Sequence, residues 1–294
     1  MDLKGKRTQL LLLLVLALSY AEITLIGALG PTLERVFHFG DTTLGLLAAT
    51  SNVVSAIATI PLGVLTDRTK RTMLLAVCLA LWAAGVGALG AAVSLAMFFA
   101  ARLLLGGVAA VTGPAVPSLV GDLVPASQRA RAFGLVESGQ LVGGGLGFIM
   151  AAAITAFVSF RWCFWLLGVA GALLAVTFWR LPEPKRTTAG PAEREGNEAP
   201  RETRVQRLVR EAGIAPSKSA ILREDAARMS LWHAARYFIR VRTDIIMVTS
   251  RAVGDFFLAA ISTFGVLFAT KQYGLSQSAA DLSMLILGVG SLAG

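Results

Sequence analysis

Long apolar stretches with few charges alternate with short polar connections along most of the chain. A helix needs about 20 predominantly apolar residues to cross the hydrocarbon of a bilayer. The pattern predicts seven such spans, and an eighth apolar stretch begins at residue 282. The predicted spans are residues 9–29, 44–65, 72–93, 95–120, 132–157, 163–179 and 245–268. We therefore expect an all-α membrane protein, because a helix satisfies its backbone hydrogen bonds within lipid.

The order of the spans predicts two unequal bundles joined by a polar segment. Residues 1–182 hold six spans, which form a six-helix bundle, and residues 183–244 form a linker. Residues 245–294 hold the seventh span and thirteen residues of the eighth. Thirteen residues at about 1.5 Å each cannot cross roughly 30 Å of hydrocarbon. We expect a truncated product that lacks most of the second bundle.

The distribution of positive charge predicts the orientation of the spans. Cations concentrate on one side of the predicted bundle, in its connections and at the N-terminus: Lys4, Lys6, Arg7, Arg68, Lys70, Arg71, Arg129 and Arg131. The connections on the other side hold only Arg35 and Arg161. Cytoplasmic loops carry the excess of Lys and Arg, so we expect the N-terminus and the linker to be cytoplasmic, in a bacterial inner membrane.

The composition narrows the class of protein further. With 55% hydrophobic and 15% charged residues, the chain does not resemble a soluble domain. Its net charge of +9 would suit nucleic acid, but the cations form no groove interleaved with aromatic residues. We therefore expect a lipid bilayer and no nucleic acid as partner. Cys78 and Cys163 both lie in apolar spans and are expected to be free, buried thiols.

The linker mixes both signs of charge and contains turn residues near its start. Residues 201–211 and 217–242 place apolar side chains on one helical face among cations. Such segments form amphipathic helices on a membrane surface or under a bundle. A solvated helical linker that docks nowhere is the alternative interpretation.

Between the second and third spans lies a basic loop that contains Gly63, Asp67, Arg68 and Arg71. Glycine lets a second backbone approach closely, and Asp67 can accept hydrogen bonds at a neighbouring helix N-terminus. The loop resembles the signature loop of the major facilitator superfamily, which has the form G-x-x-x-D-R-x-x-R at this place. The resemblance implies two six-helix halves, transport by alternating access, and a conformational role for these four residues. We therefore expect Asp67→Ala to cut transport without preventing membrane insertion.

Other motifs bear on the branch of the family. Arg102 and Gly106 resemble the R-x-x-x-G element of proton-linked exporters, although Leu105 stands where exporters often carry Gln. Gly134, Gly143 and Gly147 have the spacing of the antiporter motif, with Phe148 in place of its Pro. Residues 121–129 are similar to a loop of the spinster-like and organic-anion branches. The resemblance therefore identifies the superfamily and leaves these three branches open.

Charges inside a span are costly and therefore suggest function. Glu22 lies near the middle of the first span, where reversible protonation, substrate contact or a structural hydrogen bond would each account for it. Arg102 either extends its side chain to the membrane surface or faces inward, where its guanidinium suits a carboxylate or phosphate. If its side chain reaches down the bundle, Arg102 can pair with Glu22. Asn52 is a candidate for lining the same cavity.

Two further groups complete the candidate site. Glu137 and Gln140 share a face of the fifth span at i, i+3. Glu137 suits either a gate paired with Arg129 or Arg131, or contact with the substrate. Arg251 and Asp255 are spaced i, i+4 in the seventh span and predict a structural ion pair.

Nothing in the sequence indicates an enzyme, a cofactor or a metal. His38 and His233 have no ligand partners at metal spacing, and no nucleotide-binding fingerprint follows a strand. We expect a secondary transporter for a small organic solute, coupled to protons or driven by the solute gradient alone. A non-transporting membrane scaffold or regulator, or an inactive fragment of a transporter, are the alternatives.

Overall fold

The computed structural model describes residues 3–155, 157–183, 211, 213 and 231–293, and every regular element in these ranges is helical. The transmembrane-length helices are α1 (Leu3–Ala28), α3 (Asp41–Arg68), α4 (Arg71–Ala91), α7 (Arg129–Thr155), α8 (Arg161–Trp179) and α11 (Arg242–Tyr273). Shorter elements are α2 (Gly30–Phe37), α5 (Leu95–Ala109), α6 (Thr112–Leu123), the 3-10 turn η1 (Ala126–Gln128), α10 (Leu231–Arg240) and α12 (Gln277–Ala293).

Seven stretches in the described ranges are long and apolar enough to cross a membrane, with α5 and α6 together forming one of them. All seven predicted spans coincide with these stretches, so the prediction of an all-α membrane protein is confirmed. The predicted ends differ by a few residues, because polar residues such as Asp41 and Arg242 extend the helices beyond their apolar parts. The eighth stretch begins earlier than predicted, at Gln277 instead of residue 282.

The connection between the first two spans contains a helix that the hydropathy pattern does not predict. Where only a polar connection is expected, residues 30–37 form α2, with Pro31 in its first turn. Proline suits that turn because its missing N–H would have no partner in the helix. The helix ends at His38, whose φ of 54° is left-handed. The helix buries Gly30 and Leu33 but also carries Glu34 and Arg35, so it is too polar for a search for apolar spans to detect.

The fourth span is divided into two helices. The helix is broken between Ala109 and Thr112. The Thr112 hydroxyl donates to the carbonyl of Ala109 at 2.7 Å and thereby bridges the break. Pro114 falls in the first turn of α6, where its missing N–H breaks no helical hydrogen bond.

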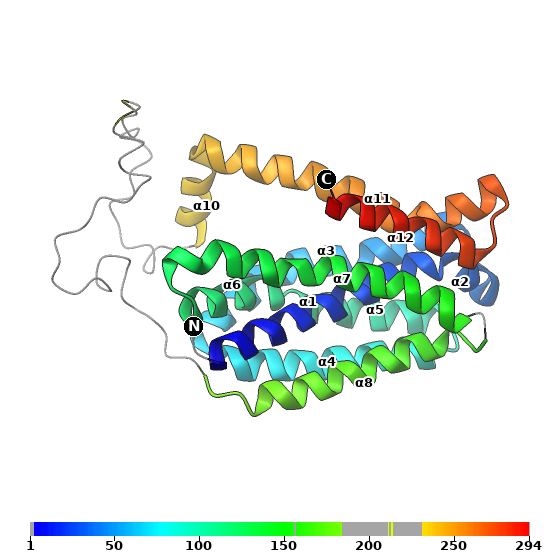
Figure 1. Cartoon of the computed structure of the whole chain (residues 1–294), viewed down its shortest axis with the longest axis horizontal. Helices are drawn as coiled ribbons and strands as arrows, with labels where there is room; N and C mark the ends of the chain where they lie inside the picture. Colours follow the sequence, from blue (N-terminus) through cyan, green and yellow to red (C-terminus); the bar gives the residue numbers. More distant parts are fainter. Residues whose placement is uncertain (1–2, 156, 184–210, 212, 214–230, 294) are drawn as a thin grey trace. The chain divides into compact units, whose positions relative to one another are not determined.

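By internal packing the chain separates into two units. The first combines residues 1–186 with residues 260–294, and the second is residues 187–259. In the first unit α1 packs along α7, α4 along α8, α3 against α5, and α12 against α7 (Figure 1). In the second unit the described part is α10 and the start of α11. Of the predicted amphipathic helices, 217–242 overlaps α10, whereas most of 201–211 lies outside the described residues.

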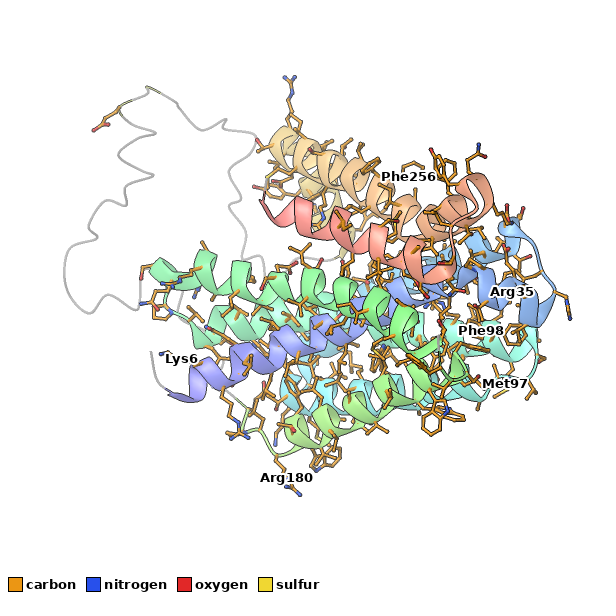
Figure 2. All side chains as sticks on the ribbon, turned by 45° about the vertical axis from the view of Figure 1, so that its right-hand side comes forward. Lys6, Arg35, Met97, Phe98, Arg180 and Phe256 are labelled. Carbon is orange, nitrogen blue, oxygen red and sulfur yellow. The ribbon has the colours of Figure 1, made fainter. Side chains whose placement is uncertain are left out.

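The two ends of the first unit differ in the cations they present. Figure 2 shows Lys6 and Arg180 at one end of the helices and Arg35 at the other.

Near Arg35, Phe98 of α5 packs edge-on against Phe164 of α8, with ring centroids 6.0 Å apart. Both rings are fully buried, so this aromatic pair ties α5 to α8.

Cys78 and Cys163 are free and buried, as predicted.

Candidate functional site

The most deeply buried ion pair that the structure describes joins α1 to α5. The Glu22 carboxylate accepts a hydrogen bond from Nη1 of Arg102. The two side chains are 5% and 2% exposed, so neither charge is solvated by bulk water. Of the alternatives for Arg102, the structure therefore has the inward-facing one. Each charge offsets the cost of burying the other, and both would be destabilising alone.

The local packing of α3 and α5 brings Arg102 to Glu22. Nε of Arg102 donates to the carbonyl of Leu47 at 3.2 Å, and the Ser51 hydroxyl donates to the carbonyl of Arg102 at 3.1 Å. One turn further along α5, a Cβ on Gly106 would lie only 2.4 Å from the carbonyl oxygen of Ser51. Only glycine allows this approach. The R-x-x-x-G spacing thus combines a buried guanidinium with the close contact that positions it.

Glu22 lies in the wall of a pocket of about 270 Å³, which we call the central pocket. The pocket is lined by residues of α1, α3, α4, α5 and α6 together with Ala110 of the break between α5 and α6. Its polar lining residues are Ser19, Tyr20, Glu22, Ser51, Asn52, Ser55, Thr59 and Thr112, and its largest apolar one is Trp82. The structure therefore places Asn52 in the lining of the same pocket as Glu22. A pocket that combines aromatic side chains with many hydroxyl groups, an amide and a carboxyl group suits a small polar organic molecule.

Glu137 and Gln140 lie elsewhere. Gln140 donates to the carboxylate of Glu137, as their i, i+3 spacing suggests. Glu137 is exposed, and the described residues that line the central pocket do not include it. Within the described chain, Arg129 does not form the suggested pair with Glu137 and donates instead to the carbonyls of Val124 and Gly121. The guanidinium of Arg129 thereby satisfies two carbonyl groups at the end of α6.

A second ion cluster surrounds Arg71 at the start of α4. Arg71 is 2% exposed and contacts the carboxylate of Asp122 at 2.6 Å and that of Glu183 at 3.1 Å. Glu183 also accepts hydrogen bonds from the backbone N–H and the hydroxyl of Thr72, at 2.8 and 2.7 Å. A carboxylate at a helix N-terminus satisfies an N–H that has no helical partner. The cluster therefore joins the start of α4 to the end of α6 and to the segment after α8.

Stability should depend on pH through Glu183. Burial raises the pKa of Glu183, but the hydrogen bonds from Thr72 and Arg71 outweigh it and hold the pKa below the ordinary 4.5. A lowered pKa in the folded state stabilises the fold above pH 4.5, and this contribution is lost as pH falls through the lower value. We expect Glu183→Gln to lower the unfolding midpoint at pH 7. The wild-type and variant midpoints should converge at low pH, and a constant difference between them would contradict this account.

The other residues of the predicted signature loop behave differently from Arg71. Arg68 is exposed. Within the described chain nothing lies within 4 Å of a Cβ built on Gly63, so the expected close approach of another backbone is wrong for this arrangement. The side chain of Asp67 lies outside the described residues. Its conformational role stays a prediction.

At the opposite end of the first unit, α11 and α12 contact α2 and α3. Lys271 pairs with Asp41 and lies 3.3 Å from the carboxylate of Glu34. Burial raises the pKa of Glu34, and the neighbouring Asp41 raises it further. Gln277 accepts from the Thr32 hydroxyl at 2.6 Å and donates to the carbonyl of Ala28 at 3.0 Å. These contacts anchor the α11–α12 hairpin.

Two remaining expectations concern single sites. Arg251 and Asp255 of α11 form the predicted i, i+4 pair at 2.8 Å, and both side chains are more than half exposed. The described residues contain no cluster of His, Cys, Asp and Glu that could hold a metal ion.

Sequence reasoning missed Glu183, Asp122 and Lys271 as interacting residues. Each lies near the end of a helix, where a charge is ordinarily explained by solvent. A usable signal was the short distance in sequence between Glu183 and the end of the sixth span, which allows its carboxylate to reach the adjacent α4 N-terminus.

Comparison with known proteins finds a family model and several relatives that match this chain. The family model of the Major Facilitator Superfamily matches residues 12–294. Protein spinster homolog 3 of Mus musculus is 28% identical over 192 residues, which cover 64% of this chain and 37% of that protein. The hexuronate transporter of Bacillus subtilis (strain 168) is 23% identical over 176 residues, covering 60% of this chain and 42% of that protein.

Solved structures resemble the fold. A bacterial homologue of the human lysosomal transporter Spinster, in an inward-facing and unoccupied conformation, has a TM-score of 0.75 at 20% identity. The match covers 98% of this chain and 60% of that one. The D-xylose-proton symporter has a TM-score of 0.66 at 16% identity and matches 96% of this chain and 65% of its own. The chain thus spans less than two-thirds of the length of these relatives.

Proposed function

Because the chain belongs to the Major Facilitator Superfamily, we propose that the protein containing it is a secondary transporter that moves a small organic solute by alternating access. The observation that carries the proposal is the buried ion pair of Glu22 and Arg102. Glu22 lies in the wall of the central pocket, and Arg102 binds to it from behind that wall. Intramembrane charges are costly, and a purely structural scaffold has no need of them. Solute sites in this class of fold lie near the middle of the bilayer, where Glu22 is expected.

The pair supports coupling to protons. An ionised Glu22 is stabilised by Arg102, whereas a protonated Glu22 no longer forms an ion pair. Its protonation would release Nη1 of Arg102, while Nε stays bound to the Leu47 carbonyl. A freed guanidinium suits a carboxylate or phosphate. We infer that the proton and the solute either compete for the Glu22–Arg102 pair or bind to it together. Asn52 and the hydroxyl groups of the central pocket contact the solute.

Transport assays in sealed vesicles test the coupling. A hexuronate serves as first probe, because a relative transports one and because its carboxylate matches Arg102. D-xylose is the neutral comparison. Glu22→Gln is expected to abolish accumulation driven by a pH gradient but to permit exchange of labelled for unlabelled solute, since exchange moves no net proton.

Glu137→Gln is the matched control, because it neutralises a carboxylate that lies outside the central pocket. It should retain both activities. Wild-type accumulation by Glu22→Gln, with the same pH profile, would make that carboxylate a structural hydrogen-bond acceptor and contradict proton coupling through it.

We further propose that the end of the bundle carrying Arg71 faces the cytoplasm of a bacterial cell. The excess of Lys and Arg at that end supports this orientation. A single cysteine at position 192 should resist a membrane-impermeant maleimide in intact cells and react after lysis. Labelling in intact cells would reverse the assignment.

A further inference from the structure

A second buried carboxyl group, which the proposed function does not use, lies on α12. Asp281 is 0% exposed, and within the described chain neither of its carboxyl oxygens has a hydrogen-bond partner. Buried polar groups in proteins nearly always have such partners. An isolated carboxylate without a donor or a cation is far costlier to bury than a neutral carboxyl group.

The position of Asp281 follows from the seating of α12 on the bundle. The helix packs against α7, and Leu285 lies 3.5 Å from a Cβ built on Gly145. One turn before Asp281, the side chain of Gln277 accepts a hydrogen bond from Thr32 and donates one to the carbonyl of Ala28. The same seating thus satisfies Gln277 and buries Asp281 without a partner.

The charged groups of the surrounding helices do not compensate Asp281. On α7 the nearest is Glu137, eight residues before Gly145 and thus roughly 12 Å further along the helix. On α1, Glu22 is engaged by Arg102. On α11, Lys271 is engaged by Asp41 and Glu34.

The α8 helix carries two further groups. Cys163 is fully buried, and its thiol donates to the carbonyl of Met150 on α7 at 3.6 Å. Arg161, at the start of the same helix, donates to the carbonyls of Gly90 and Ala92. On α2, Arg35 donates to the carbonyl of Pro31 and to the Thr32 hydroxyl. Among the described residues, none of these cations forms a hydrogen bond with the carboxyl oxygens of Asp281.

We propose that Asp281 is a second proton-binding site, occupied when α12 is seated on α7 and vacated when α12 moves away. Ionisation would place an unpaired charge in the interface, so release of the proton to water and unseating of the helix favour one another. The proposal goes beyond the coupling assigned to Glu22, since it concerns whether α12 is seated and does not require a transported solute.

A Gly145→Cys substitution supplies a reporter, because a Cβ there lies 3.5 Å from Leu285 of α12. In a background without Cys78 and Cys163, the rate at which N-ethylmaleimide modifies that cysteine in the membrane-embedded protein measures how often this interface opens. The rate is measured between pH 5.5 and pH 8.5 and divided by the rate for Asp281→Asn at the same pH, which removes the intrinsic reactivity of the thiol. An ionised carboxylate would by itself slow thiolate formation, the opposite of the expected effect.

We expect the ratio of the wild-type rate to the Asp281→Asn rate to rise about tenfold or more between pH 5.5 and pH 8.5. Such a rise corresponds to a tenfold increase in the equilibrium constant for opening the interface. Asp281→Leu, which is also neutral, should behave as Asp281→Asn. The matched control is Asp255→Asn, which removes an exposed aspartate of α11 and should follow the wild type. A flat wild-type ratio would overturn the proposal. Fast labelling of both neutral variants at every pH would also overturn it, because a neutral side chain at this position would then not keep α12 seated. A flattened profile for Asp255→Asn would contradict it as well.

Discussion

Removing either member of the Glu22–Arg102 pair should destabilise the fold strongly and unequally. Breaking a buried ion pair typically costs about 3–5 kcal/mol, because one charge remains without a partner. Glu22→Leu leaves a guanidinium that cannot lose its proton, so the full cost remains. Arg102→Leu leaves a carboxyl group that can take up a proton and become neutral. We therefore expect Glu22→Leu to be the more damaging variant.

Thermal unfolding of the purified protein in detergent at several pH values measures the difference. Arg102→Leu should regain stability as the pH falls, whereas Glu22→Leu should not. The double variant should be more stable than Glu22→Leu alone, because it leaves no buried charge. Additive losses in the double variant would show that the two side chains act independently and would contradict the pairing.

The second large effect is expected at Gly143 of α7. A Cβ at this position would lie 2.0 Å from the carbonyl oxygen of Ala17 on α1, and backbone cannot yield as a flexible side chain does. Gly143→Ala should therefore separate α1 from α7 and cost about 1–3 kcal/mol or more by overpacking. The fraction of protein that stays monodisperse after heating, measured by size-exclusion chromatography, reports the loss.

Gly134→Ala on the same helix is the control, because its Cβ would meet nothing within 4 Å in the described chain. It should be neutral or slightly stabilising, since alanine exceeds glycine in helix propensity by about 1 kcal/mol. Equal effects of the two substitutions would mean that the α1–α7 contact is looser than described. The comparison also separates the antiporter-like spacing into its parts, since Gly143 is at a helix contact and Gly134 is not.

The sequence by itself determined the class of protein and the position of its spans. Hydrophobicity over about 20 residues is a local property that a bilayer selects directly, so it can be read without knowing which helices touch. The family was also accessible, because the signature loop and the R-x-x-x-G element are contiguous in sequence. Glu22 and Arg102 stood out individually for the same reason: a charge in an apolar stretch is visible locally.

Tertiary structure alone decided which of these charges meet. Glu22 and Arg102 are 80 residues apart, and their contact depends on the approach of α5 to α3 at Gly106 and Ser51. Arg71 binds Asp122 near the end of α6 and Glu183 in the segment after α8, and among the described residues Asp281 is buried without a hydrogen-bond partner on a helix that packs against α7. The hydropathy of a span does not encode how its helix is rotated or which neighbour it packs against. Close packing at small residues sets both, and it therefore decides whether a buried charge is paired or left alone.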